Sequence, residues 1–243
     1  MEILAHRGAS ADAPENTLAA FREAVAQGAD GVELDVRLCA SGEVVVCHDP
    51  TLERLAGLPW KVRFTSWRKL RRADVGTRLG FAAEGIPLLG DALALLPPRM
   101  LVNVELKCEA VDDGGLTART LDVIRSAGAE ARVLVSSFNA ICLVRLAALA
   151  PGLRRGYLVD PDNSFLVHGA LIPPWACNFS VHPHHGAATA ARVRRWKDGG
   201  YRVAAWTVDE PSEARRLDAL GVDYLITNRP AQMRQALRSR GPP

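Results

Sequence analysis

Two histidines, three carboxylates and two cations occur at or just after short apolar runs of the sequence. They are His6, Arg7, Glu33, Asp35, His48, Glu105 and Lys107. Imidazole changes its protonation near neutral pH, so one histidine can accept a proton while the other donates one. Carboxylates bind hard divalent cations, and Arg and Lys bind phosphate oxygens. Together these groups have the chemistry that hydrolysis of a phosphate ester needs.

Glu33 and Asp35 lie two residues apart on a predicted strand, so both side chains point to the same face. Burying two carboxylates without partners is costly. One interpretation is a pair of structural salt bridges to Arg37 or Lys107. The interpretation that we favour adds Glu105 from the neighbouring strand and places one divalent cation among the three carboxylates. A ligand set of oxygens alone favours Mg²⁺ or Ca²⁺ over zinc.

The histidines and cations also have a structural explanation. A single histidine inside a protein is commonly held by hydrogen bonds without doing chemistry, and Arg7 or Lys107 could form a surface salt bridge. We favour a functional role for His6 and His48 because they occur together with the carboxylates. Arg7 and Lys107 would then hold phosphate oxygens, with Arg suited to bidentate contact.

Aromatic residues and a second group of histidines follow later strands. Phe138 and Trp206 could pack at the rim of the fold or form an apolar wall for a small polyol or headgroup. His182, His184 and His185 lie close together in the sequence, but they lack the companion Cys/His group of a zinc site. We therefore do not expect zinc there.

Strand-like and helix-like segments alternate along the 243 residues. The eight segments that we expect as strands, each followed by a helix, are 3–5, 31–36, 100–106, 132–136, 154–158, 177–181, 201–205 and 223–226. Apolar strands that alternate with helices indicate a parallel sheet covered by helices. Eight such units in this length fit a closed (β/α)₈ TIM barrel better than an open sheet. The helical pattern at 163–170 is weak. We expect a single domain over 1–243, in which residues 50–90 form a small insertion after the second strand.

In such a barrel the loops after the strands build the active site. The candidate residues follow the strands of this pattern, so we expect them at one rim of the barrel. Gly8 would let the first loop turn tightly, with His6 and Arg7 facing the carboxylates. The segment 14–17 predicts a helix start, with Asn16 as the candidate cap.

Composition excludes several other classes of protein. Lys and Arg exceed Asp and Glu by 30 to 27, and a net charge of +3 is too small to imply nucleic acid. No window reaches the roughly 18 apolar residues of a membrane span, and residues 1–5 lack the basic start of a secretory signal, so we expect no stable membrane anchor. Five cysteines without C-x-x-C spacing indicate reduced thiols and a cytoplasmic protein. The sequence leaves open whether the chain forms a homodimer.

At these residues the chain resembles the glycerophosphodiester phosphodiesterase family over nearly its whole length. The motifs that carry the resemblance are His6-Arg7-Gly8-Ala9, Pro14-Glu15-Asn16-Thr17, Gly31-Val32-Glu33-Leu34-Asp35-Val36, His48-Asp49, Glu84-Gly85-Ile86-Pro87, Asn103-Val104-Glu105-Leu106-Lys107, Ser137-Phe138, Ala205-Trp206-Thr207-Val208 and Ile226-Thr227-Asn228-Arg229-Pro230. His-Arg-Gly alone would be a weak signal, but the set is highly specific.

The resemblance implies a TIM barrel with a small insertion after the second strand. It also implies hydrolysis of a small-molecule glycerophosphodiester to sn-glycerol 3-phosphate and an alcohol, with one divalent metal ion, Mg²⁺ or Ca²⁺. It implies that His6 and His48 are the acid–base pair and that Glu33, Asp35 and Glu105 are the metal ligands. It further implies that Arg7 and Lys107 contact the phosphate and that Phe138 and Trp206 lie near the glycerol.

Three departures from the family pattern bear on the choice of substrate. Leu55-Ala56 replaces threonines that are often present, Asp209 stands where Asn is commoner, and Asn228 stands where Asp is frequent. None of them touches a proposed catalytic or metal residue. Which histidine is the base stays open, as does attack by water or by the substrate's own glycerol 2-hydroxyl.

Two other functions stay open. A related barrel that cleaves larger phospholipids, such as a sphingomyelinase-like phospholipase D, would use the same histidines and metal. We would expect such an enzyme to expose an apolar rim or to carry stabilising disulfides and a secretion signal, and the sequence shows neither of the last two. A non-catalytic barrel that binds headgroups would need neither both histidines nor all three carboxylates.

Overall fold

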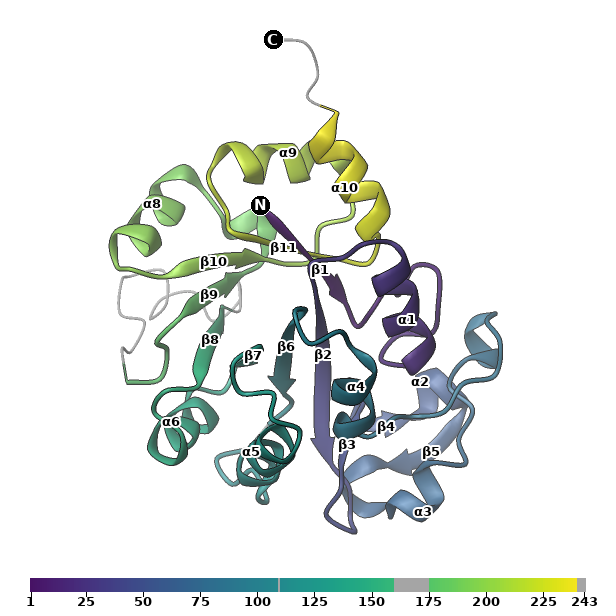
Figure 1. Cartoon of the computed structure of the whole chain (residues 1–243). Coiled ribbons are helices and arrows are strands. Elements are labelled where there is room, and N and C mark those ends of the chain that lie inside the picture. Colours follow the sequence, from purple (N-terminus) through teal and green to yellow (C-terminus); the bar gives the residue numbers. More distant parts are fainter. Residues whose placement is uncertain (109, 160–174, 240–243) are drawn as a thin grey trace.

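The computed structural model describes residues 1–108, 110–159 and 175–239. Within them, parallel strands form a closed barrel in the order β1-β11-β10-β9-β8-β7-β6-β2, because β2 pairs again with β1. The barrel strands are β1 (Glu2–His6), β2 (Gly31–Leu38), β6 (Leu101–Leu106), β7 (Val133–Ser137), β8 (Arg154–Val159), β9 (Ser180–Pro183), β10 (Arg202–Ala205) and β11 (Tyr224–Thr227). The first and last strands therefore lie side by side (Figure 1). The prediction of a (β/α)₈ TIM barrel is confirmed.

Helices follow the barrel strands along the chain. They are α1 (Leu18–Ala26), α4 (Leu89–Leu95), α5 (Leu116–Ser126), α6 (Ala140–Leu149), α8 (Ala190–Asp198), α9 (Pro211–Ala219) and α10 (Pro230–Arg238). The helix predicted at 163–170 lies outside the described residues. Among the described helices, none is long and apolar enough to cross a membrane.

The helices cover the barrel with one apolar face each. On α5 the buried residues recur at helical spacing, as in Leu116, Thr120 and Ile124. The strands beneath are buried on both faces, and all six residues of β6 are buried. Polar side chains inside the barrel therefore have to find partners within the protein, which concentrates the charged groups described below.

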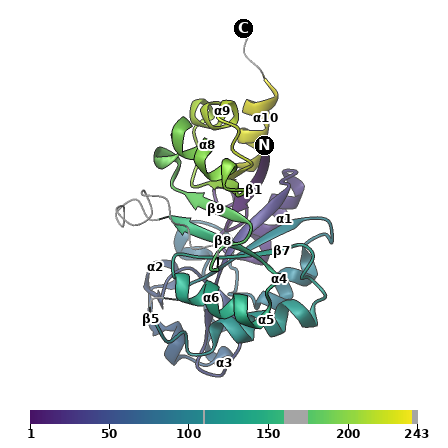
Figure 2. The same ribbon diagram turned by 90° about the vertical axis from the view of Figure 1, so that its left-hand side faces the viewer.

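The segment between β2 and α4 forms the predicted insertion. β3 (Val44–Val46) runs antiparallel to the end of β2. It is followed by β4 (Thr51–Leu52), α2 (Glu53–Ala56), β5 (Leu58–Lys61) and α3 (Trp67–Leu70). These elements pack around a small apolar cluster of their own, and the turned view places α2, α3 and β5 at the opposite end of the molecule from α8, α9 and α10 (Figure 2). The insertion ends earlier than residue 90, because α4 begins at Leu89.

Candidate active site

A cavity of about 250 Å³ opens among residues at the carboxyl ends of the barrel strands. Eight of the nine predicted site residues line it: His6, Arg7, Glu33, His48, Glu105, Lys107, Phe138 and Trp206. The ninth, Asp35, is buried and contacts Arg7 and Lys107. Strand register explains the gathering, since His6 pairs with Glu33 across β1 and β2, and Asp35 pairs with Glu105 across β2 and β6.

Glu33, Asp35 and Glu105 form a compact acidic cluster. Each offers a carboxylate oxygen, and these oxygens all lie within 4.8 Å of one another. The side chains belong to buried residues with at most 7% exposure. Among the residues that the structure describes, this is the one group of His, Cys, Asp and Glu with the spacing of a metal site.

The pKa values of the three carboxyl groups reflect their mutual repulsion and their burial. Burial and the charges of Asp35 and Glu105 raise the pKa of Glu33 well above its ordinary value. Burial and the charge of Asp35 raise the pKa of Glu105 to about 7. Burial acts in the same direction on Asp35, but the charges of Lys107 and Arg7 outweigh it and lower the pKa of that carboxyl. Repulsion between carboxylates is therefore only partly offset by the neighbouring cations.

Arg7 and Lys107 lie against this cluster. Arg7 Nε is 3.1 Å from Asp35 Oδ2, and Lys107 Nζ is 3.1 Å from Asp35 Oδ1 and also pairs with Glu105. Of the salt bridges that the sequence suggested for Glu33 and Asp35, the one between Asp35 and Lys107 is present, and Glu33 instead accepts from the backbone N–H of Arg7. Arg37 Nε donates to the carbonyl oxygen of His48. Arg7 has a left-handed φ of 56°, a strained conformation for a residue with a Cβ and one that concentrates at functional sites.

The expectation that no departure from the family pattern touches a proposed catalytic residue is wrong, because Asn228, directly after β11, contacts His6 and is itself held by Asp209 in the loop after β10. The Nδ1 of His6 lies 2.7 Å from Asn228 Oδ1. The Asn228 amide nitrogen donates to Asp209 Oδ2 at 2.6 Å, which fixes the amide so that its oxygen faces the histidine. His6 therefore carries its proton on Nδ1 and presents the Nε2 lone pair, 3.9 Å from Glu33. Burial and the charge of Arg7 lower the pKa of His6 to about 4, so the ring is neutral at neutral pH.

His48 has a carboxylate partner instead of an amide. Its Nδ1 lies 2.7 Å from Asp49 Oδ1, and Arg54 Nε holds the other oxygen of Asp49 at 2.7 Å. Arg54 also pairs with Glu15, whose Oε1 is 2.9 Å from Arg7 Nη1. A chain of ion pairs thus connects the insertion, which supplies Arg54, to the first loop of the barrel. The sequence places Glu15 within a motif of the family without indicating its contacts, and it gives no signal for Arg54.

The helix start at 14–17 differs from the prediction. Thr17, not Asn16, caps α1, since the Thr17 hydroxyl accepts from the backbone N–H of Ala20. Asn16 has a left-handed φ of 58°, and its side chain donates to Asp35 Oδ2 at 2.8 Å and accepts from the Asp35 backbone N–H. Asn16 therefore positions a carboxylate of the acidic cluster.

Phe138 and Trp206 both line the cavity and contact each other. The rings of Phe138 and Trp206 meet edge to face, with centroids 5.6 Å apart. Trp206 Nε1 donates to the carbonyl oxygen of His182, and the His182 ring pairs with the Ser180 hydroxyl. Phe138 is 40% exposed, so part of this aromatic wall is open to a ligand.

Comparison with known proteins agrees with this arrangement. The model of the glycerophosphoryl diester phosphodiesterase family matches residues 6–232. A glycerophosphodiester phosphodiesterase of Caldanaerobacter subterraneus is 34% identical, with 98% of each chain covered. An Oleispira antarctica phosphodiesterase, solved in complex with the product sn-glycerol-3-phosphate, has a TM-score of 0.89 at 32% identity, covering 98% of this chain and 97% of that one. A Thermotoga maritima glycerophosphodiester phosphodiesterase has a TM-score of 0.80 at 27% identity, with 96% of each chain covered. The chain therefore belongs to the glycerophosphoryl diester phosphodiesterase family, a family of phosphoric diester hydrolases.

Proposed function

We propose that the protein hydrolyses glycerophosphodiesters to sn-glycerol 3-phosphate and an alcohol, using one divalent cation, Mg²⁺ or Ca²⁺. The observation that carries this proposal is the buried cluster of Glu33, Asp35 and Glu105 in contact with the cavity that His6 and His48 line. The product bound to the Oleispira antarctica relative supports the same class of substrate.

The acidic cluster fits a hard divalent cation. Its donors are all oxygens from buried side chains, the ligand chemistry of Mg²⁺ and Ca²⁺. Three carboxylates face only two cations, Arg7 and Lys107, so the ionised cluster has a net negative charge. A bound dication would make the site net positive and complementary to a phosphodiester monoanion. When bound, the ion would polarise the phosphoryl group and stabilise charge in the transition state.

The different partners of the two histidines suggest different roles. Asn228 offers His6 a neutral oxygen, and burial and the charge of Arg7 lower the pKa of His6 more than this hydrogen bond raises it, so the free Nε2 suits a general base. Burial lowers the pKa of His48, and the carboxylate of Asp49 opposes this by stabilising the protonated ring, which suits a general acid. We therefore assign proton abstraction to His6 and proton donation to His48.

The two histidines would move protons while one bond to phosphorus forms and another breaks. His6 takes a proton from the attacking hydroxyl, whose oxygen forms a bond to phosphorus. The bond from phosphorus to the alcohol oxygen breaks, and His48 protonates the departing oxygen. The attacking hydroxyl is either water or the substrate's glycerol 2-hydroxyl. The second route forms a cyclic phosphate, which water must then open, with His48 taking a proton from the water and His6 returning its proton to the 2-oxygen, to give glycerol 3-phosphate. Trapping that cyclic ester during turnover distinguishes the two.

The remaining residues hold the substrate. Arg7 and Lys107 lie at the cavity with the charge and reach to bind phosphoryl oxygens. Phe138 and Trp206 provide the apolar wall against which the carbon face of glycerol would pack.

A panel of substrates tests the activity. Purified protein, first dialysed against EDTA, is supplied with Mg²⁺ or Ca²⁺ and offered several glycerophosphodiesters and intact phospholipids. Release of glycerol 3-phosphate is measured for the glycerophosphodiesters, and release of the free alcohol is measured for both kinds of substrate. We expect release from the glycerophosphodiesters. Cleavage of intact phospholipids alone would favour a phospholipase, and release from no substrate would favour a binding protein.

Two variants test the roles of the histidines. His6→Ala and His48→Ala should each lower turnover by roughly 10²–10⁴-fold, the range of general acid–base catalysis. A diester with p-nitrophenol as its leaving group needs no protonation of that group. It should therefore restore much of the activity of His48→Ala and little of that of His6→Ala. The opposite pattern would reverse the assignment.

The proposal also covers the domain organisation, the cellular compartment and the oligomeric state of the protein. We propose that the chain functions as one domain and acts in the cytoplasm. Its five cysteines are free thiols, four of them buried, which agrees with a reducing compartment. Whether two copies associate is measured by sedimentation.

A further inference from the structure

One guanidinium group of the insertion contacts the partners of two functional side chains. Arg54 lies in α2 and does not line the cavity of the candidate active site. Its Nε lies 2.7 Å from Asp49 Oδ2, and its Nη1 and Nη2 each lie 2.8 Å from a different oxygen of Glu15. All three nitrogens therefore donate to two carboxylates, which the single nitrogen of a lysine could not do in the same geometry.

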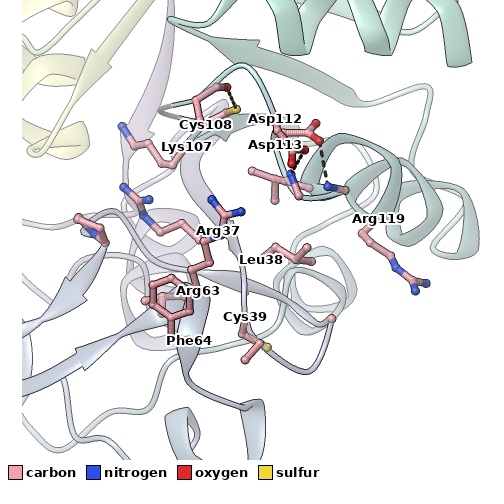
Figure 3. Close-up of a pocket in the computed structure, with 18 of the residues that line it drawn as sticks. Arg37, Leu38, Cys39, Arg63, Phe64, Lys107, Cys108, Asp112, Asp113 and Arg119 are labelled. Atoms are coloured by element: carbon pink, nitrogen blue, oxygen red, sulfur yellow. Dashed lines mark hydrogen bonds between the residues drawn. The ribbon is translucent and has the colours of Figure 1, made fainter.

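Asp49 connects Arg54 to His48. Its other oxygen, Oδ1, lies 2.7 Å from His48 Nδ1. The main chain of His48 is held separately, because Arg37 donates from Nε to the His48 carbonyl oxygen at 2.8 Å. Arg37 lines the second, larger cavity that Figure 3 shows, next to the end of β2. Arg37 thus restrains the main chain at His48, and the contact with Asp49 restrains the ring.

Glu15 connects Arg54 to Arg7. Glu15 Oε1 accepts from Arg7 Nη1 at 2.9 Å, and Arg7 Nε lies 3.1 Å from Asp35 Oδ2. Within residues 1–108, 110–159 and 175–239, Arg7 Nη2 donates no hydrogen bond. The two carboxylates therefore fix the plane of the Arg7 guanidinium and leave Nη2 for a phosphoryl oxygen in the cavity.

Arg54 also keeps both of its carboxylate partners ionised. Burial raises the pKa of Glu15, but the hydrogen bond from Arg54 and the charge of Arg7 outweigh burial and lower that pKa below its ordinary value. Burial is opposed in the same way at Asp49, where hydrogen bonds with Arg54 and His48 lower the pKa. Without Arg54, each carboxylate would be free to turn away from the side chain that it holds.

The insertion fixes Arg54 through its own apolar core. Leu52 and Leu55, close to Arg54 in the chain, are buried in the apolar cluster of the insertion. The Arg54 side chain itself is 46% exposed. Because ion pairs with so exposed a partner contribute little to folding, replacement of Arg54 should leave the Tm nearly unchanged. A loss of activity would then report on the orientation of the site.

We infer that Arg54 is a positioning residue for the reaction, supplied by the insertion from outside the cavity. It holds His48, the proposed acid, through Asp49. It holds Arg7, the proposed phosphate contact, through Glu15. The inference rests on the proposed function, because it names the residue that orients two members of the same site.

Two substrates and three substitutions test the inference. The leaving group of glycerophosphocholine needs a proton, whereas that of the p-nitrophenyl ester of glycerol 3-phosphate does not. Asp49→Ala should lower kcat for glycerophosphocholine about tenfold and change kcat for the p-nitrophenyl ester little, since loss of a partner that orients a site residue commonly costs 10–100-fold. Glu15→Ala should instead raise KM for both substrates. Arg54→Ala should show both effects with an unchanged Tm.

A triple variant shows whether Arg54 acts through these two carboxylates. In the background of Asp49→Ala and Glu15→Ala, Arg54→Ala should lower kcat/KM far less than it does in the wild type, because its partners are already absent. This comparison does not depend on which histidine is the acid. Arg68→Ala, at an exposed position of α3 in the same insertion, should leave kcat and KM unchanged for both substrates.

The outcomes separate the two proposals. An Arg54→Ala protein with the kinetic constants of the wild type overturns the inference while the hydrolase proposal stands. So does an effect of Arg54→Ala that is as large in the triple variant as in the wild type, or an equal fall in kcat for both substrates with a lowered Tm, which is the result of a structural role. Hydrolysis of neither substrate, nor of any in the panel, by the wild type removes the proposed function and this inference with it.

Discussion

The pair formed by Asn228 and Asp209 offers a sharp test of how His6 is held. In the present structure one amide and one carboxylate face each other at 2.6 Å. Asn228→Asp would replace this hydrogen bond by two carboxylates. At an effective dielectric constant of about 20, two unit charges about 4 Å apart repel by about 4 kcal/mol. We therefore expect the free energy of unfolding at pH 8 to fall by up to about that amount, and less where one carboxyl takes up a proton.

A second substitution should reverse this loss. Asp209→Asn in the Asn228→Asp background restores one amide and one carboxylate with their positions exchanged. The amide at 209 can still accept from Thr227 Oγ1, and the carboxylate at 228 can accept from His6 Nδ1 and Ser10 Oγ. The double variant should therefore recover most of the stability and turnover that Asn228→Asp alone loses.

Urea denaturation and turnover of glycerophosphocholine measure both quantities. The double-variant cycle, with Asp209→Asn as the second single variant, gives the coupling free energy between the two positions. A coupling near zero, or an Asn228→Asp protein as stable and active as the wild type at pH 8, would refute the idea that this pair fixes the orientation of His6.

Three further predictions concern the cluster, the first loop and the aromatic wall. In EDTA, the free energy of unfolding of the wild type relative to that of Glu105→Gln should fall as pH rises from 4.5 to about 7, by on the order of 3 kcal/mol, because the raised pKa of Glu105 means that the folded protein keeps a proton that the unfolded chain has lost. The lowered pKa values of His6 and His182 act in the opposite direction and cancel in this difference. Saturating Mg²⁺ should weaken the trend in urea titrations, and a flat difference in EDTA would contradict it. Gly8→Ala should lower stability by more than about 2 kcal/mol, since Gly8 has φ +84° and a Cβ there would lie 2.6 Å from Ala20 backbone and Cβ atoms; an unchanged Tm would contradict this. Trp206→Ala should raise KM for glycerophosphocholine about tenfold, equivalent to about 1.4 kcal/mol, and an unchanged KM would limit the Trp206–Phe138 contact to packing.

The strands and the rim were predictable because their signals are local. Apolar runs identify buried parallel strands, and chain order then places the residue after each strand at the same rim. That reasoning brought His6, Glu33, Asp35 and Glu105 together correctly. It also located β11 within one residue, since the run ending at Ile226 is continuous.

The predictions were wrong where contacts between distant parts of the sequence determine the local structure. The strand predicted at 177–181 is found at Ser180–Pro183, because Asn178 turns the chain and accepts from the backbone N–H of Arg155 before pairing with β8 begins. Asn16 was a reasonable cap by residue type, but the adjacent Thr17 caps α1 and Asp35 engages the Asn16 side chain. No local pattern reports such partners.

The residues that orient the histidines could be predicted only in part. Asp209 and Asn228 stood out as departures from the family pattern, but their pairing depends on the adjacency of β10 and β11. The contact from Arg54 to Glu15 joins the insertion to the first loop across 39 positions of sequence. These contacts follow from the strand register of the closed barrel, and composition and periodicity do not predict them.

The requirement for a divalent cation at Glu33, Asp35 and Glu105 is the central claim, and one titration tests it most directly. Protein freed of metal by EDTA and dialysis is titrated with Mg²⁺ or Ca²⁺ while release of glycerol 3-phosphate from glycerophosphocholine is followed. The account predicts no release without the cation and saturation at one ion per chain, with Glu105→Gln needing far higher concentrations. Full activity in EDTA, or an unchanged titration in Glu105→Gln, would contradict it.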